Sequence, residues 1–259
     1  MLSQLVQRLA GLCGYAIMRS EKYARLRILD NYKPNDSTFN EHLREVFKRF
    51  NVACVLDVGA NDGAYAESLR KAVGYEGWIH SFEPLPGRRE ELERKAANDP
   101  RWVIHTCALG AESGEAEFNV TADDVFSSFL APDAGQPTKY ADSNRVSQKV
   151  KVKVSTVAEV LPEILQTCGG GAVYLKMDTQ GFDMQVFAGA LPALSHVVGL
   201  QSELAFRTIY AAAPDWKAML AAVEKQGFLP SFFLPISFDQ DLSILEADGI
   251  FVRAAASAA

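Results

Sequence analysis

The sequence lacks any hydrophobic run long enough to span a bilayer, which takes about 18–20 apolar residues in succession. Its best run, residues 9–18, is short and interrupted by two glycines, and no small-residue cleavage site follows it, so we expect neither a membrane span nor a secretory signal. Internal repeats, low-complexity tracts and Pro/Gly-rich linkers are also missing. With 48% hydrophobic and 22% charged residues, the composition is that of a folded globular protein, which excludes disordered and fibrous classes.

Cysteine is scarce in the chain. The four cysteines, Cys13, Cys54, Cys107 and Cys168, lie far apart and form no Cys-x-x-Cys pair. Such spacing is not typical of a disulfide framework, and three of the four have apolar neighbours in the sequence. We therefore expect reduced core thiols and a cytoplasmic protein.

Positive charge is also in deficit, with 26 Lys and Arg against 32 Asp and Glu, a net charge of −6. Residues 1–50 nevertheless hold nine basic and five acidic residues, so the remainder carries 17 against 27. An acidic body argues against nonspecific nucleic-acid binding, which needs a positive stripe to neutralise phosphates. The basic excess at the front is explained either as a solvated face or as a contact with a membrane surface.

The same front segment has apolar residues on one face of a predicted helix. They are Leu2, Leu5, Val6, Leu9, Leu12, Cys13, Ala16 and Ile17. A helix packed on the body of the protein is the simpler interpretation. The alternative is peripheral contact with the inner membrane surface through residues 1–30.

From residue 51 onward, predicted strands alternate with predicted helices, after a further amphipathic helix at residues 37–50. Strands are expected at residues 52–58, 78–82, 102–107, 149–154, 173–177, 197–204, 228–234 and 249–252. Helices are expected at residues 64–73, 88–97, 156–165 and 215–226 and after Gly181. Strands that alternate with helices indicate a sheet covered on both faces. The sequence therefore predicts a doubly wound α/β domain at residues 51–253, with a helical extension at 1–50 and a disordered tail at 254–259.

The first informative stretch is Val-Leu-Asp-Val-Gly-Ala-Asn-Asp-Gly at residues 55–63, in which a hydrophobic strand ends at Asp57 and a glycine-rich turn opens a helix. In an open parallel sheet, ligands bind at the carboxyl ends of the strands. Gly59 and Gly63 allow a close backbone approach to a ligand. The dinucleotide fingerprint G-x-G-x-x-G is absent, because position 61 is Asn and no glycine follows at 64. An acid before the turn suits a cationic amino-acid group better than a pyrophosphate.

A second acidic residue, Glu83, ends the next strand, in His-Ser-Phe-Glu-Pro at residues 80–84. A carboxylate at this position can accept hydrogen bonds from both hydroxyls of a ribose. Together with Asp57 and the glycine turn, Glu83 predicts a site for a nucleoside cofactor.

These motifs resemble the FkbM-type S-adenosylmethionine-dependent methyltransferases. The resemblance covers residues 38–253 and includes Asp-Val-Gly-Ala-Asn-Asp-Gly, Phe-Glu-Pro and Ala-Leu-Gly at 108–110. It continues in Lys-Met-Asp-Thr-Gln-Gly-Phe-Asp at 176–183, in Ala-Gly-Ala at 188–190, and in Glu203 with Tyr210. One departure is Asp183, where the family usually has Glu, so the partner of that carboxylate is in question.

The resemblance implies a Rossmann-like methyltransferase sheet of seven strands with the last antiparallel, and S-adenosylmethionine as the cofactor. Asp57, Gly59, Asn61 and Gly63 would face the methionine part, and Glu83 would hold the ribose. The remaining implied pocket residues are Phe82 and Pro84 beside the ribose, Cys107 and Ala108 near the adenine, and Ser127 and Ser128. The two serines lie in a loop that follows a hairpin at residues 115–120, and this loop either closes over the site or is solvated.

Methyl transfer to an alcohol requires alignment of nucleophile, methyl group and sulfur, exclusion of water, and removal of the hydroxyl proton. Asp178 and Glu203 close neighbouring strands and should point into one cleft, so they are the candidate catalytic residues. The structural alternative is that each carboxylate caps a helix. Asp178, Asp183 and Glu203 could also hold a divalent cation, but no spacing requires it and no metal is predicted.

The four histidines, His42, His80, His105 and His196, have no partner at metal-ligand or triad spacing and are interpreted as structural. Lys176, inside the strand before Asp178, either reaches the cleft or lies on a solvated strand edge. Residues 121–145 and 207–216 are expected to shape the acceptor pocket.

The sequence thus favours an O-methyltransferase, for which the family's range implies a hydroxyl acceptor on a sugar, glycolipid or polyketide-like molecule. One alternative is an NAD-dependent oxidoreductase or sugar-modifying enzyme, although the chain lacks a Tyr-x-x-x-Lys pair. Another is an inactive scaffold that binds S-adenosylmethionine, against which the intact Asp57 and Glu83 argue.

Overall fold

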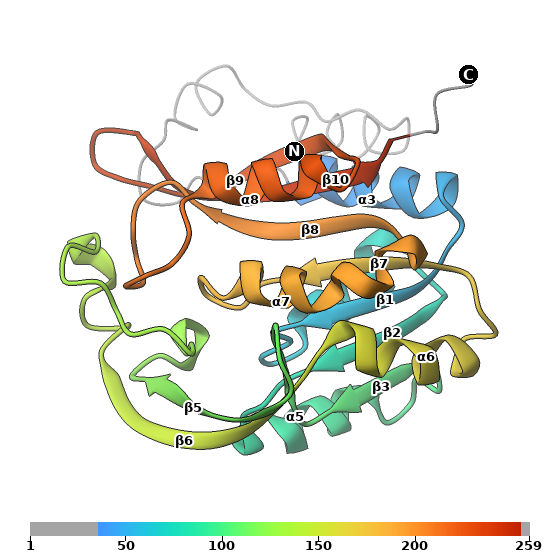
Figure 1. Ribbon diagram of the computed structural model, residues 1–259, viewed down its shortest axis with the longest axis horizontal. Helices are drawn as coiled ribbons and strands as arrows, with labels where there is room; N and C mark the ends of the chain where they lie inside the picture. The colour runs from blue at the N-terminus through green and yellow to red at the C-terminus, as the bar shows by residue number, and fades with distance from the viewer. Residues whose placement is uncertain (1–35, 255–259) are drawn as a thin grey trace, which may run out of the picture. The chain divides into compact units, whose positions relative to one another are not determined.

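A computed structural model describes residues 36–254 of the chain, with a seven-stranded sheet at its centre (Figure 1). The strand order is β3-β2-β1-β7-β8-β10-β9. The strands are β1 (Val52–Val58), β2 (Trp78–Phe82), β3 (Trp102–His105), β7 (Ala172–Met177), β8 (Val197–Ala205), β9 (Phe228–Phe238) and β10 (Ile244–Arg253). Pairs from β3 to β8 are parallel, whereas β10 is antiparallel to both β8 and β9. The predicted doubly wound α/β fold and the antiparallel last strand are confirmed.

Helices cover both faces of this sheet, as the continuous apolar strands require. On one face lie α6 (Val157–Thr167), α7 (Asp183–Ala190) and α8 (Trp216–Lys225), which share a core with Leu56 and Phe82. On the other lie α3 (Asp36–Arg49), α4 (Ala64–Ser68) with its π-helical continuation Leu69–Val73, and α5 (Pro86–Ala96), which share a core with Val55 and Ile79. Figure 1 shows α6 and α7 lying in front of the sheet.

A small second sheet, of order β4-β6-β5, connects β3 to α6. Its strands are β4 (Ala108–Leu109), β5 (Gly114–Thr121) and β6 (Val146–Ser155). In β6, exposed lysines alternate with inward valines, which confirms the expected wet face. Two expectations were wrong. The hairpin at residues 115–120 is instead an antiparallel pairing of β5 with the distant β6. The strand expected to reach Cys107 ends at His105, because the chain leaves the large sheet there to join the small one.

Within residues 36–254, no helix has both the length and the apolar character needed to cross a membrane. The amphipathic segment expected within residues 1–30 lies outside the described residues, as does the tail from residue 255.

Candidate functional site

The turns after β1 and β2 are hydrogen-bonded to each other at the carboxyl edge of the sheet. The backbone N–H groups of Gly59 and Ala60 each donate to the carbonyl of Phe82 at 3.1 Å. The N–H of Asn61 donates to Oε2 of Glu83 at 2.9 Å. The two sequence motifs expected to bind a nucleoside cofactor therefore form one continuous cradle.

Glycine is required in the first turn by a close approach of β7. Gly59 has φ +76°, and a Cβ atom placed on it would lie 1.9 Å from the carbonyl oxygen of Asp178. Gly63, with φ +82°, packs where a Cβ would meet Leu92 and Trp102 at about 3 Å. The absence of a side chain at Gly59 thus lets the turn after β1 lie directly against the end of β7, and its absence at Gly63 lets the turn pack on α5 and β3.

Glu83 is buried, and its two oxygens accept the backbone N–H groups of Asn61 and Leu85, both at 2.9 Å. Burial raises the pKa of this carboxyl, and the two backbone hydrogen bonds oppose the rise. Beside it, Oδ1 of Asn61 is buried and finds no hydrogen-bond partner among the described residues. A buried acceptor without a donor costs free energy unless a ligand supplies one. These acceptors fit the hydroxyl and amine donors of a nucleoside cofactor.

Asp57 lies beneath the turn with no solvent exposure, in a row of polar residues across the sheet. Strand register places it between Ser81 and Lys176. Its Oδ2 accepts from the Ser81 hydroxyl at 3.0 Å, and its Oδ1 lies 3.1 Å from Nζ of Lys176. Nζ also donates to the carbonyl of Gly59 at 2.9 Å. The acid therefore acts on the turn through this buried lysine.

Lys176 is 3% exposed, so its interpretation as a solvated strand edge was wrong. Burial disfavours its charge, but the carboxylates of Asp57 and Asp178 outweigh burial and raise the pKa of the ammonium. The Nζ atom lies 3.5 Å from Oδ2 of Asp178, which links the turn after β1 to the end of β7.

The other residues implied as cofactor contacts are either half-buried after a strand or buried in the core. Pro84 is half-buried after β2, Cys107 is half-buried after β3, and Ala108 is buried at the start of β4. Phe82 is buried and stacks on His105, with ring centroids 4.4 Å apart. Phe82 therefore supports the cradle from the core of the sheet.

Ser127 and Ser128 are both buried, and each hydroxyl forms a hydrogen bond to the backbone. The hydroxyl of Ser127 accepts from the backbone N–H of Thr121 at 3.2 Å. The hydroxyl of Ser128 donates to the carbonyl of Gln180 at 2.8 Å. The alternative of a solvated loop was therefore wrong, because both serines are buried and Ser128 joins the loop to the segment that follows β7.

Asp178 and Glu203, the candidate catalytic residues, are brought together by Gln180. Its Nε2 donates to Oδ1 of Asp178 and to Oε2 of Glu203, both at 3.1 Å. Its Oε1 accepts from the hydroxyl of Tyr210 at 2.7 Å. Gln180 has φ +54°, a left-handed conformation that aims its amide between the two acids.

The electrostatic environment of Glu203 disfavours its charge. Burial, followed by the charges of Glu246 and Asp178, raises the pKa of this carboxyl well above its usual range. Glu246 accepts hydrogen bonds from the hydroxyls of Tyr140 at 2.6 Å and Ser237 at 3.0 Å. Glu203 is thus a carboxylate whose affinity for a proton is increased by its surroundings.

Asp183, the departure from the family pattern, is fully used inside the protein. Its Oδ1 accepts from the backbone N–H of Thr179 at 2.8 Å and from the Thr179 hydroxyl at 2.5 Å. Its Oδ2 accepts from the Ser202 hydroxyl at 2.7 Å and the Glu203 N–H at 3.1 Å. The shorter side chain therefore positions Glu203 and the start of α7. Within residues 36–254, Asp178, Asp183 and Glu203 do not converge as a set of cation ligands.

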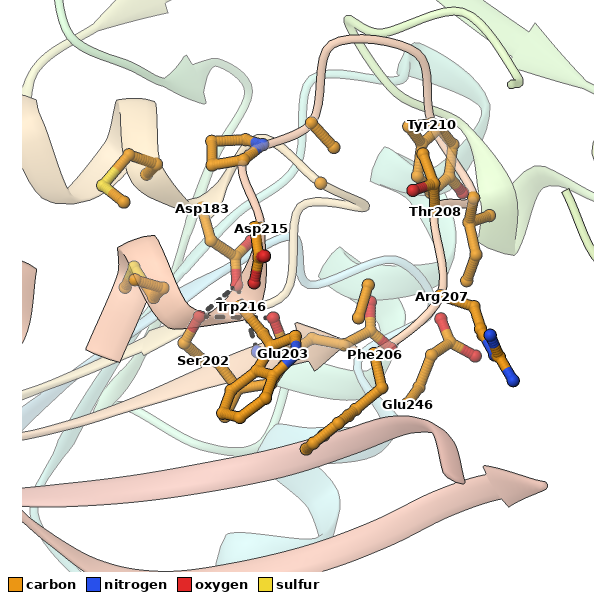
Figure 2. Close-up of a pocket in the computed structure, with 18 of the residues that line it drawn as sticks. Asp183, Ser202, Glu203, Phe206, Arg207, Thr208, Tyr210, Asp215, Trp216 and Glu246 are labelled. Atoms are coloured by element: carbon orange, nitrogen blue, oxygen red, sulfur yellow. Dashed lines mark hydrogen bonds between the residues drawn. The ribbon is translucent and has the colours of Figure 1, made fainter. Parts of the chain in front are cut away.

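A cavity of about 290 Å³ opens beside Glu203 (Figure 2). Its walls include residues 202–210 and 213–217 together with Gly181, Asp183, Met184, Met219 and Glu246. Phe206 and Trp216 stack with centroids 4.7 Å apart and give the cavity an aromatic wall. Residues 121–145 do not line it but approach it through Tyr140, which bonds Glu246.

Sequence reasoning missed Gln180, Tyr140 and Glu246 as parts of this site. Gln180 lies in the sequence between Asp178 and Asp183, inside the family block at 176–183. That position could have marked it as a site residue. Tyr140 and Glu246 lie in segments without a motif, and their contact depends on the pairing of β10 with β9. No local pattern indicates such a contact.

Comparisons with known proteins identify the family of the chain. A family model described as the methyltransferase FkbM domain matches residues 57–230. No curated protein gives a significant match. Similar solved structures include an FkbM methyltransferase from Methylobacillus flagellatus KT, at 13% identity and TM-score 0.47, with 77% of this chain covered but only 44% of that chain.

Two further solved structures were crystallised with the cofactor or its product. Fibrillarin from Aeropyrum pernix, in complex with S-adenosyl-L-methionine, is 10% identical with TM-score 0.43, covering 83% of this chain and 74% of that one. The N-methyltransferase NodS from Bradyrhizobium japonicum WM9, in complex with S-adenosyl-L-homocysteine, is 8% identical with TM-score 0.42, covering 89% and 91%. The identities and TM-scores of these solved structures assign no role to any residue of this chain. Membership of the family rests on the family model. The chain belongs to the FkbM family of S-adenosylmethionine-dependent methyltransferases.

Proposed function

We propose that the protein transfers a methyl group from S-adenosylmethionine to a hydroxyl of a sugar-like small molecule. The observation that carries the proposal is the position of Glu203, which lines the aromatic-walled cavity and is linked through Gln180 to Asp178, beside the lysine that holds the turn after β1. A base at this boundary is where an acceptor hydroxyl would meet a methyl donor.

The cofactor would lie in the cradle, where Glu83 would accept the ribose hydroxyls and Oδ1 of Asn61 would accept a further donor. When bound, S-adenosylmethionine supplies an electrophilic methyl group on a sulfonium. Lys176 fixes the carbonyl of Gly59 and keeps the turn in place. Ser128 holds the loop over the edge and so limits the access of water.

The acceptor would occupy the cavity. Glu203 and Glu246 offer acceptors for hydroxyl groups, and Phe206 with Trp216 offers an apolar wall for the face of a sugar ring. This combination supports a sugar or glycolipid more than a purely apolar polyketide. A glycolipid would also agree with membrane contact through residues 1–30, which co-sedimentation with anionic liposomes, with and without those residues, would test.

In the reaction, Glu203 would accept the proton of the acceptor hydroxyl as the methyl group is transferred. Gln180 would keep Asp178 and Glu203 at a fixed separation, and Asp178, whose side chain is 40% exposed, would orient the hydroxyl. The high pKa of Glu203 increases its strength as a base.

Calorimetric titration with S-adenosylhomocysteine tests the cofactor site. We expect micromolar binding by the wild type and at least tenfold weaker binding by Glu83→Ala, because the ribose loses its acceptor. The control is Glu93→Ala, an exposed glutamate on α5, which should bind as the wild type does. Equal affinity in all three proteins, or binding of NADH in its place, would refute the site.

Transfer of a labelled methyl group to a panel of monosaccharides and glycolipids tests the reaction. With an accepted substrate, we expect Glu203→Gln to lower kcat by about 100-fold or more while S-adenosylhomocysteine still binds. Full activity in Glu203→Gln would show that Glu203 is not the general base and would leave Asp178 as the candidate. Methylation of amines without methylation of any hydroxyl compound would overturn the proposed O-methylation.

A further inference from the structure

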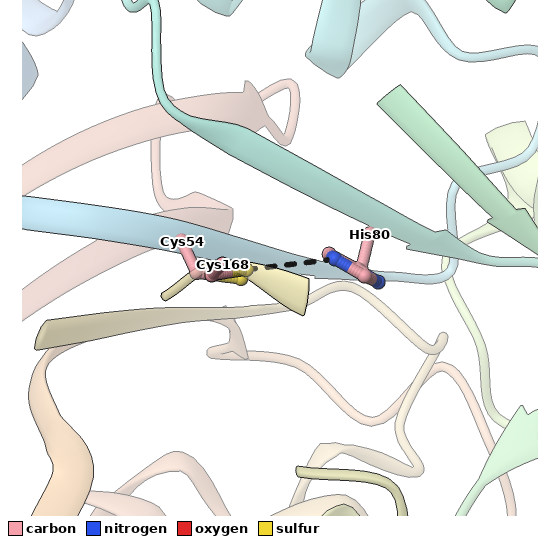
Figure 3. A group of neighbouring side chains, drawn as sticks. All are labelled: Cys54, His80 and Cys168. Atoms are coloured by element: carbon pink, nitrogen blue, oxygen red, sulfur yellow. Dashed lines mark hydrogen bonds between the residues drawn. The ribbon is translucent and has the colours of Figure 1, made fainter. Parts of the chain in front are cut away.

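Three side chains with metal-binding chemistry meet on the α6 side of the sheet, outside the site described above (Figure 3). Cys54 lies on β1, His80 lies on β2, and Cys168 directly follows α6. Their two Sγ atoms and one ring nitrogen all lie within 4.8 Å of one another. Within residues 36–254, this is the one group of three His, Cys, Asp or Glu ligand atoms that converges so closely.

The distances agree with two ligands of one zinc ion. Zinc binds thiolate sulfur at about 2.3 Å and histidine nitrogen at about 2.0–2.1 Å in tetrahedral geometry, which separates the two ligand atoms by about 3.6 Å. Sγ of Cys168 lies 3.7 Å from Nε2 of His80. The pair is therefore already spaced as ligands are on either side of a metal.

A second histidine orients the first. Nδ1 of His80 lies 2.9 Å from Nε2 of His105, so one proton is shared between these nitrogens. With that proton on Nδ1 of His80, its Nε2 presents a lone pair toward Cys168. Metal-bound histidines commonly donate their other N–H to such a partner. His105 is itself held by stacking on Phe82.

We propose that Cys54, His80 and Cys168 bind a zinc ion, with water as the fourth ligand. Two thiolates and one imidazole form a ligand set that zinc accepts in proteins. Binding replaces the two thiol protons, which are released to solvent, and involves no change of oxidation state.

The surroundings provide access for the ion and the water. Cys54 and His80 are buried, but Cys168 is half-buried at the end of α6. It is followed by three glycines, residues 169–171, all with positive φ. Because this turn carries no side chains, the fourth position of a bound ion would be open to solvent from that side.

The ion would have a structural role. It would join β1, β2 and the end of α6 through Cys54 and His80, which precede Asp57 and Glu83 by three positions in the chain. The bound metal would therefore stabilise the strands that carry the cofactor cradle, while the reacting groups stay at the carboxyl edge.

Cobalt titration of the full-length protein tests the proposal. The reduced, chelator-treated protein is titrated with Co²⁺, and the thiolate-to-cobalt charge-transfer band and the d–d bands of four-coordinate cobalt are followed. We expect one Co²⁺ per chain, displaced by one Zn²⁺. We also expect at least 100-fold weaker binding in Cys168→Ser, and 10–100-fold weaker binding in His105→Ala, which removes only the orienting partner.

Two control variants, Cys107→Ser and Cys13→Ser, should bind cobalt as the wild type does. Cys168→Ser is the decisive variant because Cys168 is half-buried, and its fold is checked by circular dichroism. Absence of a stoichiometric cobalt spectrum in the wild type overturns the proposal. So does a spectrum that is unchanged in Cys168→Ser but lost in either control.

Discussion

The buried ion pair between Asp57 and Lys176 gives the sharpest prediction for stability. Lys176→Met preserves side-chain length but removes the ammonium, and leaves a fully buried carboxylate whose Oδ1 has no hydrogen-bond donor. Removing one partner of a buried pair costs about 3–5 kcal/mol. For a chain of this size that lowers Tm by on the order of 10 °C.

Asp57→Asn should cost less, about 1–2 kcal/mol, because the amide oxygen still accepts from Ser81 and Lys176 keeps Asp178 and the carbonyl of Gly59. In the double variant neither charge is stranded. Its loss should therefore fall short of the sum of the single losses by about 1–3 kcal/mol.

Urea denaturation at neutral pH, with all four proteins measured together, gives these free energies. Lys151→Met, an exposed lysine on β6, is the matched control and should change stability by no more than about 0.5 kcal/mol. The reasoning fails if Lys176→Met costs less than about 1 kcal/mol, or if the two substitutions add within about 0.5 kcal/mol.

Two further predictions concern the turn after β1 and the acids of β10. Gly59→Ala should destabilise the fold by about 3 kcal/mol or more and weaken S-adenosylhomocysteine binding, because its Cβ would meet a backbone oxygen at 1.9 Å. The control is Gly74→Ala, which has a similar φ but open space around the Cβ and should lose only about 1 kcal/mol in urea denaturation. Equal losses in the two variants would exclude the close approach as the cause. Burial, followed by the charge of Asp178, raises the pKa of Asp248 to about 7, so its contribution to stability is complete below pH 4 and is lost as the pH rises through 7. Asp248→Asn should therefore be more stable than the wild type by about 4 kcal/mol at pH 8, with the difference shrinking toward pH 4 in denaturation curves. A difference that stays constant with pH would contradict the shift.

The strand and helix pattern could be predicted from the sequence because it depends on local spacing. Runs such as residues 52–58 bury both faces in a covered sheet and therefore read as continuous apolar strands. The glycine turn and Glu83 were identifiable for the same reason, since each directly follows a strand. Cys107 was placed on a strand wrongly, because the end of β3 depends on where the chain joins the small sheet.

The partners of the site residues could not be predicted in this way. Lys176 was ambiguous in the sequence, and only the register of β1 with β7 places it opposite Asp57. The role of Asp183 likewise depends on Ser202, which the parallel pairing of β7 with β8 brings to the same edge.

The sequence by itself determined the order of strands and helices and the acids at the ends of β1 and β2, because side-chain periodicity and turn chemistry act over a few residues. The tertiary structure decided which groups meet: Gln180 between two acids, Tyr140 on Glu246, and Cys168 beside His80, 88 residues apart. Such contacts depend on sheet register and on helix packing, which are set by burial of the whole core and carry no local signature.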